Sequence, residues 1–91
     1  MKKLIDTGVK PFGERDMELG VTCVGDDVRL GDRFETETQP PVIVQVQQIE
    51  VYRAAHETLF SGYTGTIYVT VVSGDPSTIQ RVLIERPHNG S

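Results

Sequence analysis

Apolar and polar residues alternate along two segments of the chain, one near residue 20 and the other near residue 70. The apolar positions are Leu19, Val21 and Cys23 in the first segment and Ile67, Val69 and Val71 in the second. Successive side chains of a β-strand point to opposite faces of the sheet, so a period of two is typical of a strand with one buried face. Both segments are therefore predicted to be β-strands of this kind.

The same alternation continues through residues 42–51, but its phase changes in the middle. The apolar positions are Val42, Val44 and Val46 before the change and Ile49 and Val51 after it. The change falls at the pair Gln47-Gln48. A slip of one residue would turn the second half of the strand to the wrong face unless a β-bulge absorbs it. Bulges suit strongly curved sheets, so this pattern favours a barrel over a flat sheet.

Glycine, aspartate and proline mark the breaks between these segments. Residues 25–27 and 30–32 are predicted to be turns, since Gly and Asp tolerate the backbone angles that tight turns need. A short strand at residues 33–35 follows the second turn. Residues 36–41 form a polar loop that ends in two prolines, neither of which can donate to a sheet ladder.

Other stretches have weaker patterns. Residues 1–5 are a candidate edge strand, and residues 53–62 are predicted to be a structured loop because a glycine and flanking strands interrupt any helix. Residues 81–85 are predicted to be the last strand, ended by Pro87. Residues 88–91 are expected to be a disordered tail.

Length and composition indicate one all-β domain. The chain has 91 residues, a hydrophobic fraction of 37%, nine glycines and five prolines. This is enough for a single core and leaves no surplus for a second one. We therefore expect residues 1–91 to form a single small β-barrel of about six or seven mostly antiparallel strands, with a barrel core at about residues 19–87.

The charge balance argues against unassisted binding of nucleic acid. The formal net charge is −4, whereas phosphate binding normally requires a positive field. A lone cysteine, Cys23, cannot form an internal disulfide and fits a reducing compartment. Asp6, Gly8 and Lys10 interrupt any apolar region of a signal peptide, and no run approaches the length of a membrane span. We expect a soluble, cytoplasmic protein with no membrane contact.

The order of these elements resembles domain 2 of the translational GTPases, the elongation factor Tu family and its relatives. The segments that carry the resemblance are Val28-Arg29-Leu30-Gly31-Asp32-Arg33-Phe34, Gln48-Ile49-Glu50, Glu57 with Ser61-Gly62, Thr66–Val72 and Val82–Ile84. Together they cover roughly residues 19–87. The resemblance implies a β-barrel of the domain 2 type, whose loops contact RNA or neighbouring protein domains in that family.

The chain lacks the parts that give this barrel its role in translation factors. It has no GxxxxGK[ST] phosphate loop, so we expect no nucleotide hydrolysis. We expect the barrel to be a stand-alone domain. Since fold similarity does not transfer function, a role in translation is an expectation that depends on the resemblance.

No pattern of catalytic, cofactor-binding or metal-binding residues is found in the sequence. Cys23, His56 and His88 are scattered, and His56-Glu57 lacks the second histidine of an HExxH site because position 60 is Phe. Cys23 lies on the apolar phase of its strand and is expected to be a buried structural thiol. We expect no enzyme activity and no cofactor.

Binding is the remaining possibility, and its candidate residues surround the 53–62 loop. They are Tyr52, Arg53, His56, Phe60 and Tyr63. Aromatic and arginine side chains are the usual anchors of contact surfaces. The alternative is that Phe60 and one tyrosine plug the end of the barrel.

Three functions follow from these observations. The leading one is a non-enzymatic binding module with a protein partner that is linked to translation. The alternative is an RNA- or ribosome-contacting module, which the acidic balance opposes and a common face for Arg53, Arg81 and Arg86 would favour. The third is a small enzyme, which would need a concave pocket with convergent polar groups.

Overall fold

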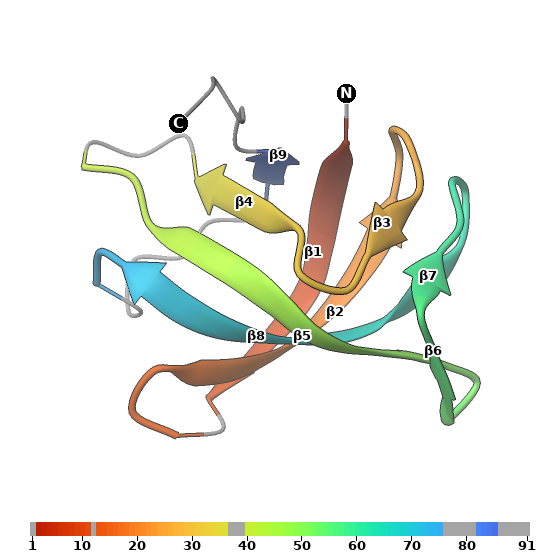
Figure 1. Ribbon diagram of the computed structural model, residues 1–91, viewed down its shortest axis with the longest axis horizontal. Helices are drawn as coiled ribbons and strands as arrows, with labels where there is room; N and C mark the ends of the chain where they lie inside the picture. The colour runs from red at the N-terminus through yellow and green to blue at the C-terminus, as the bar shows by residue number, and fades with distance from the viewer. Residues whose placement is uncertain (1, 12, 37–39, 76–81, 86–91) are drawn as a thin grey trace.

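The computed structural model describes residues 2–11, 13–36, 40–75 and 82–85, which form nine β-strands and no helix (Figure 1). The strands are β1 (Lys3–Pro11), β2 (Asp16–Cys23), β3 (Val28–Arg29), β4 (Arg33–Thr36), β5 (Ile43–Val51), β6 (Ala54–His56), β7 (Thr58–Leu59), β8 (Thr64–Ser73) and β9 (Val82–Glu85). None of the described residues belongs to a helix that is long and apolar enough to span a membrane.

Six of these strands close into a barrel. They pair in the order β4-β9-β1-β2-β8-β5, and a further pairing between β5 and β4 completes the ring. All the pairings between the described strands are antiparallel. The seventh strand of the sheet, β6, pairs with the end of β5 that β4 does not reach. Strands β3 and β7 form a separate two-stranded sheet (Figure 1). The expected all-β barrel of six or seven strands is confirmed.

The apolar positions of the alternating segments fill the barrel. The buried apolar residues are Leu4, Met17, Leu19, Val21, Cys23, Val28, Phe34, Val42, Val44, Val46, Ile49, Val51, Leu59, Ile67, Val69 and Val71. Phe34, from the short strand β4, is the largest of the fully buried side chains. Complete burial of a side chain of this size contributes about 1.5–3 kcal/mol, so the core is the main source of stability.

The predicted bulge in β5 is present. The register between β5 and β8 shifts between Val46 and Gln48, and Gln47 and Gln48 are both exposed. After the bulge, alternate side chains of β5 point into the barrel again, beginning with Ile49, which is fully buried. On its other edge β5 pairs with β4 through Ile43–Gln45 and with β6 through Ile49–Val51. The bulge therefore separates the part of β5 that closes the barrel from the part that projects beyond it.

Two expectations about individual segments are wrong. The N-terminal segment is not an edge strand, because β1 lies between β2 and β9 and the barrel begins at Lys3 rather than near residue 19. Its register shift between Asp6 and Gly8 accommodates a sequence without clean alternation. The 53–62 segment is not only a loop, since it includes β6 and β7, which are set by pairing with β5 and β3. Residues 76–81 and 86–91, with Arg81, Arg86, His88 and the expected tail, lie outside the described residues.

Candidate functional site

The turn between β5 and β6 has an unfavourable backbone conformation. Val51 and Ala54 pair across the hairpin, which leaves Tyr52 and Arg53 as a two-residue loop. Both residues have positive φ angles, 53° and 64°, as in a type I′ turn, whose twist matches that of the flanking strands. Asn and Gly are preferred at these positions because a Cβ atom disfavours the left-handed region by about 1–2 kcal/mol. The hairpin therefore retains two bulky side chains at some cost in stability.

The side chains on this turn do not contribute to the barrel core. Tyr52 is 95% exposed, and Arg53 is exposed as well. Neither side chain forms a hydrogen bond or ion pair within the described part of the chain. A strained backbone that carries solvent-facing Tyr and Arg side chains is typical of a contact site, because strain of this kind persists where function requires it.

Phe60 and Tyr63 lie on a second turn, between β7 and β8. The Tyr63 amide donates to the Phe60 carbonyl at 3.0 Å, and Gly62 supplies the positive φ of 87° that this turn needs. The Ser61 amide donates to Asp27 Oδ1 at 2.8 Å, and the Gly62 amide donates to the Cys23 carbonyl at 2.7 Å. This second turn is therefore fixed to the end of β2 and the turn after it.

The two aromatic rings on the second turn face solvent. The ring centroids of Phe60 and Tyr63 are 6.2 Å apart in an edge-to-face arrangement, and each side chain is 54% exposed. The alternative in which Phe60 plugs the barrel is therefore wrong. The residue of β7 whose side chain points into the core is the neighbouring Leu59, which is fully buried.

The five candidate residues do not form one compact patch. Tyr52 and Arg53 lie on the turn between β5 and β6, whereas Phe60 and Tyr63 lie on the turn between β7 and β8, at a separate corner of the molecule (Figure 1). His56 is exposed at the end of β6. The structure thus divides the predicted site into a strained Tyr-Arg turn and an aromatic pair, joined by two short strands.

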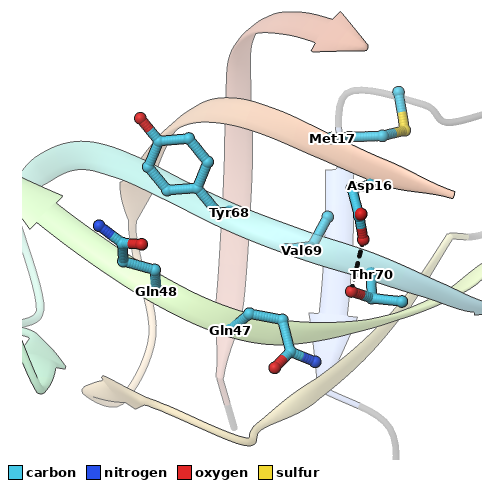
Figure 2. Close-up of a pocket in the computed structure, with 7 residues that line it drawn as sticks. All are labelled: Asp16, Met17, Gln47, Gln48, Tyr68, Val69 and Thr70. Atoms are coloured by element: carbon cyan, nitrogen blue, oxygen red, sulfur yellow. Dashed lines mark hydrogen bonds between the residues drawn. The ribbon is translucent and has the colours of Figure 1, made fainter. Parts of the chain in front are cut away.

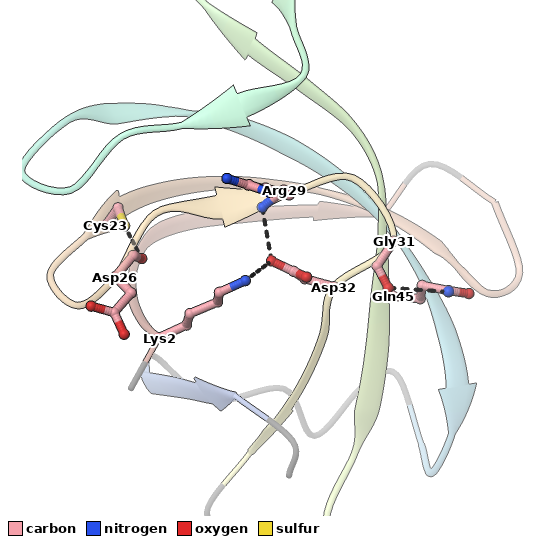
Figure 3. A network of polar contacts seen from close by, with 7 residues as sticks. All are labelled: Lys2, Cys23, Asp26, Arg29, Gly31, Asp32 and Gln45. Atoms are coloured by element: carbon pink, nitrogen blue, oxygen red, sulfur yellow. Dashed lines mark hydrogen bonds and ion pairs between the residues drawn. The ribbon is translucent and has the colours of Figure 1, made fainter. Parts of the chain in front are cut away.

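The Val28–Phe34 segment has a structural role. The Asp32 carboxylate accepts hydrogen bonds from the Arg29 amide at 2.8 Å and from Lys2 Nζ at 2.7 Å (Figure 3). The main chain of Gly31 and Asp32 exchanges two hydrogen bonds with Val46, at 2.8 and 2.9 Å. Gly31 has a φ of 88°, which explains why glycine occupies this position. These two hydrogen bonds satisfy the main chain of β5 at Val46, between the residues that pair with β4 and those that pair with β6.

Cys23 is buried at the end of β2, as expected. Its Sγ donates to the Asp26 carbonyl at 3.2 Å (Figure 3). Burial raises the pKa of the Cys23 thiol above its ordinary value. The side chain is therefore a structural thiol and not an activated nucleophile.

A row of polar side chains on the outer face of the sheet is a feature that sequence reasoning missed. Glu18, Tyr68 and Gln48 lie opposite one another on β2, β8 and β5. The Tyr68 hydroxyl donates to Glu18 Oε1 at 3.0 Å and lies 3.4 Å from Glu50 Oε1. The hydrogen bond to Glu18, with partial desolvation and the nearby charges, raises the pKa of Tyr68 to about 12. Alternation indicates that Tyr68 faces outward, but only the strand register places the glutamates around it.

A shallow hollow lies beside this row. Its volume is about 480 Å³. The lining residues are Asp16, Met17, Gln47, Gln48, Tyr68, Val69 and Thr70 (Figure 2). Thr70 Oγ1 donates to Asp16 Oδ1 at 2.7 Å, which orients that carboxylate (Figure 2). The hollow crosses β8 between β2 and β5.

Comparison with known proteins identifies the fold. No protein-family model matches the sequence, and a search of the curated proteins finds no match. Among solved structures, the chain is similar to translation elongation factor SelB from Methanococcus maripaludis in its apo form, with a TM-score of 0.76 and 15% sequence identity. The match covers 90% of this chain but only 18% of that chain. The chain therefore has the all-β fold of domain 2 of the elongation factor Tu family, as the order of the segments in the sequence indicated.

Proposed function

We propose that this chain is a non-enzymatic β-barrel binding module that contacts a protein partner through the turn between β5 and β6. The observation that supports the proposal most directly is the pair Tyr52 and Arg53, which keep positive φ angles of 53° and 64° and expose their side chains. Asn and Gly would suit this turn better, which supports a role for the Tyr52 and Arg53 side chains themselves.

A protein partner fits the chemistry of the two turns. Tyr and Arg are enriched among the residues that dominate protein interfaces, since each gives a large contact area with directed hydrogen bonds. The aromatic pair Phe60 and Tyr63 adds a second, rigid contact at a neighbouring corner, where hydrogen bonds to the end of β2 hold the turn. Because hydrogen bonds already hold the second turn in place, ordering its backbone on binding costs little entropy.

The likeness to a translation elongation factor supports a partner in the translation apparatus. This part of the proposal rests on fold similarity to a protein of which 18% is matched. A net charge of −4 favours a protein component of that apparatus over its RNA. We place the protein in the cytoplasm, where translation takes place and a lone thiol such as that of Cys23 stays reduced.

The test is affinity purification of the full chain from the native cell, followed by affinity measurement on the partner that is recovered. Replacing Arg53 and Tyr63 with Ala should weaken binding about tenfold or more, with a change in unfolding free energy below about 1 kcal/mol. Lys10→Ala is the matched control, since it removes one positive charge from an exposed position on β1. Unchanged affinity in the double variant refutes the proposal. Recovery of RNA, with affinity that falls steeply with salt, supports the RNA-contacting alternative.

A further inference from the structure

A second hollow adjoins the one beside Tyr68. It has a volume of about 330 Å³ and lies between the turn before β4 and strand β6. Its lining residues are Leu30, Gln47, Gln48, Ala55, His56 and Glu57. Gln47 and Gln48 line both hollows, so the two hollows meet at the bulge of β5, and we refer to their combined surface as the groove. This groove involves none of the four residues on the two turns proposed above.

The bulge explains why a groove forms here. β4 pairs with β5 up to Gln45, and β6 pairs with it from Ile49 onward. Between these pairings, Gln47 has no partner in register on either side among the described strands. The outer face is therefore uncovered at this point, and two consecutive amide side chains project from it. Amide side chains both donate and accept hydrogen bonds, which suits recognition of an extended main chain.

The two ends of the groove differ in character. Asp16 lines one end of the groove, and Glu18 and Glu50 lie beside it at the hydroxyl of Tyr68. These three carboxylates accept hydrogen bonds from hydroxyl and amide groups, and none forms an ion pair with a described residue. Lys10 lies opposite Glu18 on β1 without an ion pair, and the Arg15 guanidinium binds main-chain carbonyls of β8 and the turn after it. This end of the groove therefore carries three carboxylates against two cationic side chains, an excess of negative charge.

The other end is less polar. Leu30 is 45% exposed there, and Ala55 faces solvent from β6. An apolar side chain of a ligand would cover surface that water now contacts, which favours binding through the hydrophobic effect. His56 and Glu57 complete this end of the hollow.

We propose that the groove binds an extended peptide segment of a partner protein, with a lysine or arginine side chain between Glu18, Glu50 and the ring of Tyr68, and an apolar side chain beside Leu30 and Ala55. A cationic group is attracted both by carboxylates and by the face of an aromatic ring. A metal ion fits less well, because no three metal-binding side chains converge among the described residues. Nucleic acid is disfavoured because the three carboxylates would repel phosphates.

The test uses the full chain and a phage library of random dodecapeptides. Selection should enrich sequences with a basic residue near an apolar one, and a synthetic peptide of that consensus should bind more weakly at high salt. Glu18→Gln combined with Glu50→Gln should lower its affinity roughly tenfold, since it removes both carboxylates that attract the basic side chain of the peptide. Ala55→Arg should block the apolar end. Glu14→Gln removes an exposed carboxylate outside the groove and should leave the affinity unchanged.

The outcomes separate this proposal from the one above. The Arg53 and Tyr63 double variant should retain full affinity for the consensus peptide, whatever its effect on the partner from the cell. A consensus without basic residues, or equal affinity in the glutamate double variant, overturns the inference. Displacement of the peptide by an RNA oligonucleotide, or self-association that the same variant abolishes, would assign the groove to RNA or to a second copy and also overturn it.

Discussion

Replacing Tyr52-Arg53 with Asn-Gly should make the protein more stable while weakening partner binding. Both residues occupy the left-handed region in the turn between β5 and β6. Each non-glycine residue there costs about 1–2 kcal/mol, and Asn reduces this cost while Gly removes it. Because neither side chain forms a hydrogen bond or ion pair within the described residues, little is lost by removing them. We expect a gain of about 1–2 kcal/mol in the free energy of unfolding.

Thermal and urea unfolding measure this gain. For a chain of 91 residues, a change of 1 kcal/mol shifts the Tm by roughly 4–8 °C. The double variant should therefore unfold some ~5–15 °C above the natural chain, with an unchanged urea m-value. Binding to the purified partner, measured on the same samples, should weaken by about tenfold or more because the Tyr and Arg side chains are gone.

A second variant separates the backbone effect from that of the side chains. Tyr52→Ala with Arg53→Ala removes the same side chains but leaves two Cβ atoms in the left-handed region. Its stability should stay within about 0.5 kcal/mol of the natural chain. If the Asn-Gly variant is no more stable than the Ala-Ala variant, the turn is not strained. If it is more stable and binds the partner fully, the strain has no connection with binding.

Two further predictions concern the two faces of β8, Gly65 on the inner face and Tyr68 on the outer one. Gly65→Ala should destabilise the protein by about 1–3 kcal/mol in urea unfolding, because a Cβ at this position would lie 2.8 Å from the Glu50 carbonyl oxygen. Gly8→Ala is the control and should be nearly neutral, since a Cβ there would have no atom within 4 Å. Equal destabilisation by the two substitutions would contradict the packing around Gly65. Glu18, and to a smaller extent Glu50, raises the pKa of Tyr68 from 10.0 to about 12 in the folded protein. The protonated hydroxyl therefore stabilises the fold below pH 10.0, and this stabilisation is lost as the pH rises through about 12. Tyr68→Phe should abolish this loss and the corresponding step in tyrosinate absorbance, so an identical titration curve for both proteins would refute the assignment.

The parts of the fold that could be predicted from the sequence are those that depend on neighbouring residues. Alternation in residues 66–72 corresponds to β8, and the change of phase at Gln47-Gln48 corresponds to the bulge in β5. Both patterns can be recognised in the sequence because a strand with one buried face requires an apolar residue at every second position. Gly31 likewise lies in a turn with positive φ, as its residue type indicated.

The parts that could not be predicted depend on pairing between distant strands. β6 and β7 are three and two residues long, too short to show any period, and exist because β5 and β3 lie beside them. The Tyr52-Arg53 turn lacks the Asn or Gly that usually reveals such a hairpin. The polar row around Tyr68 requires the register of β2 against β8, which no local pattern in the sequence specifies.

The last described strand has a consequence for how the protein is made. β9 lies between β4 and β1, so the barrel cannot close between these two strands until Val82–Glu85 have left the ribosome. Until then, the emerging chain has unpaired edges on β1 and β4, which can add strands from other chains. Closure of the barrel therefore follows synthesis of β9, and a nascent chain that stalls before residue 82 leaves the edges of β1 and β4 open to other chains.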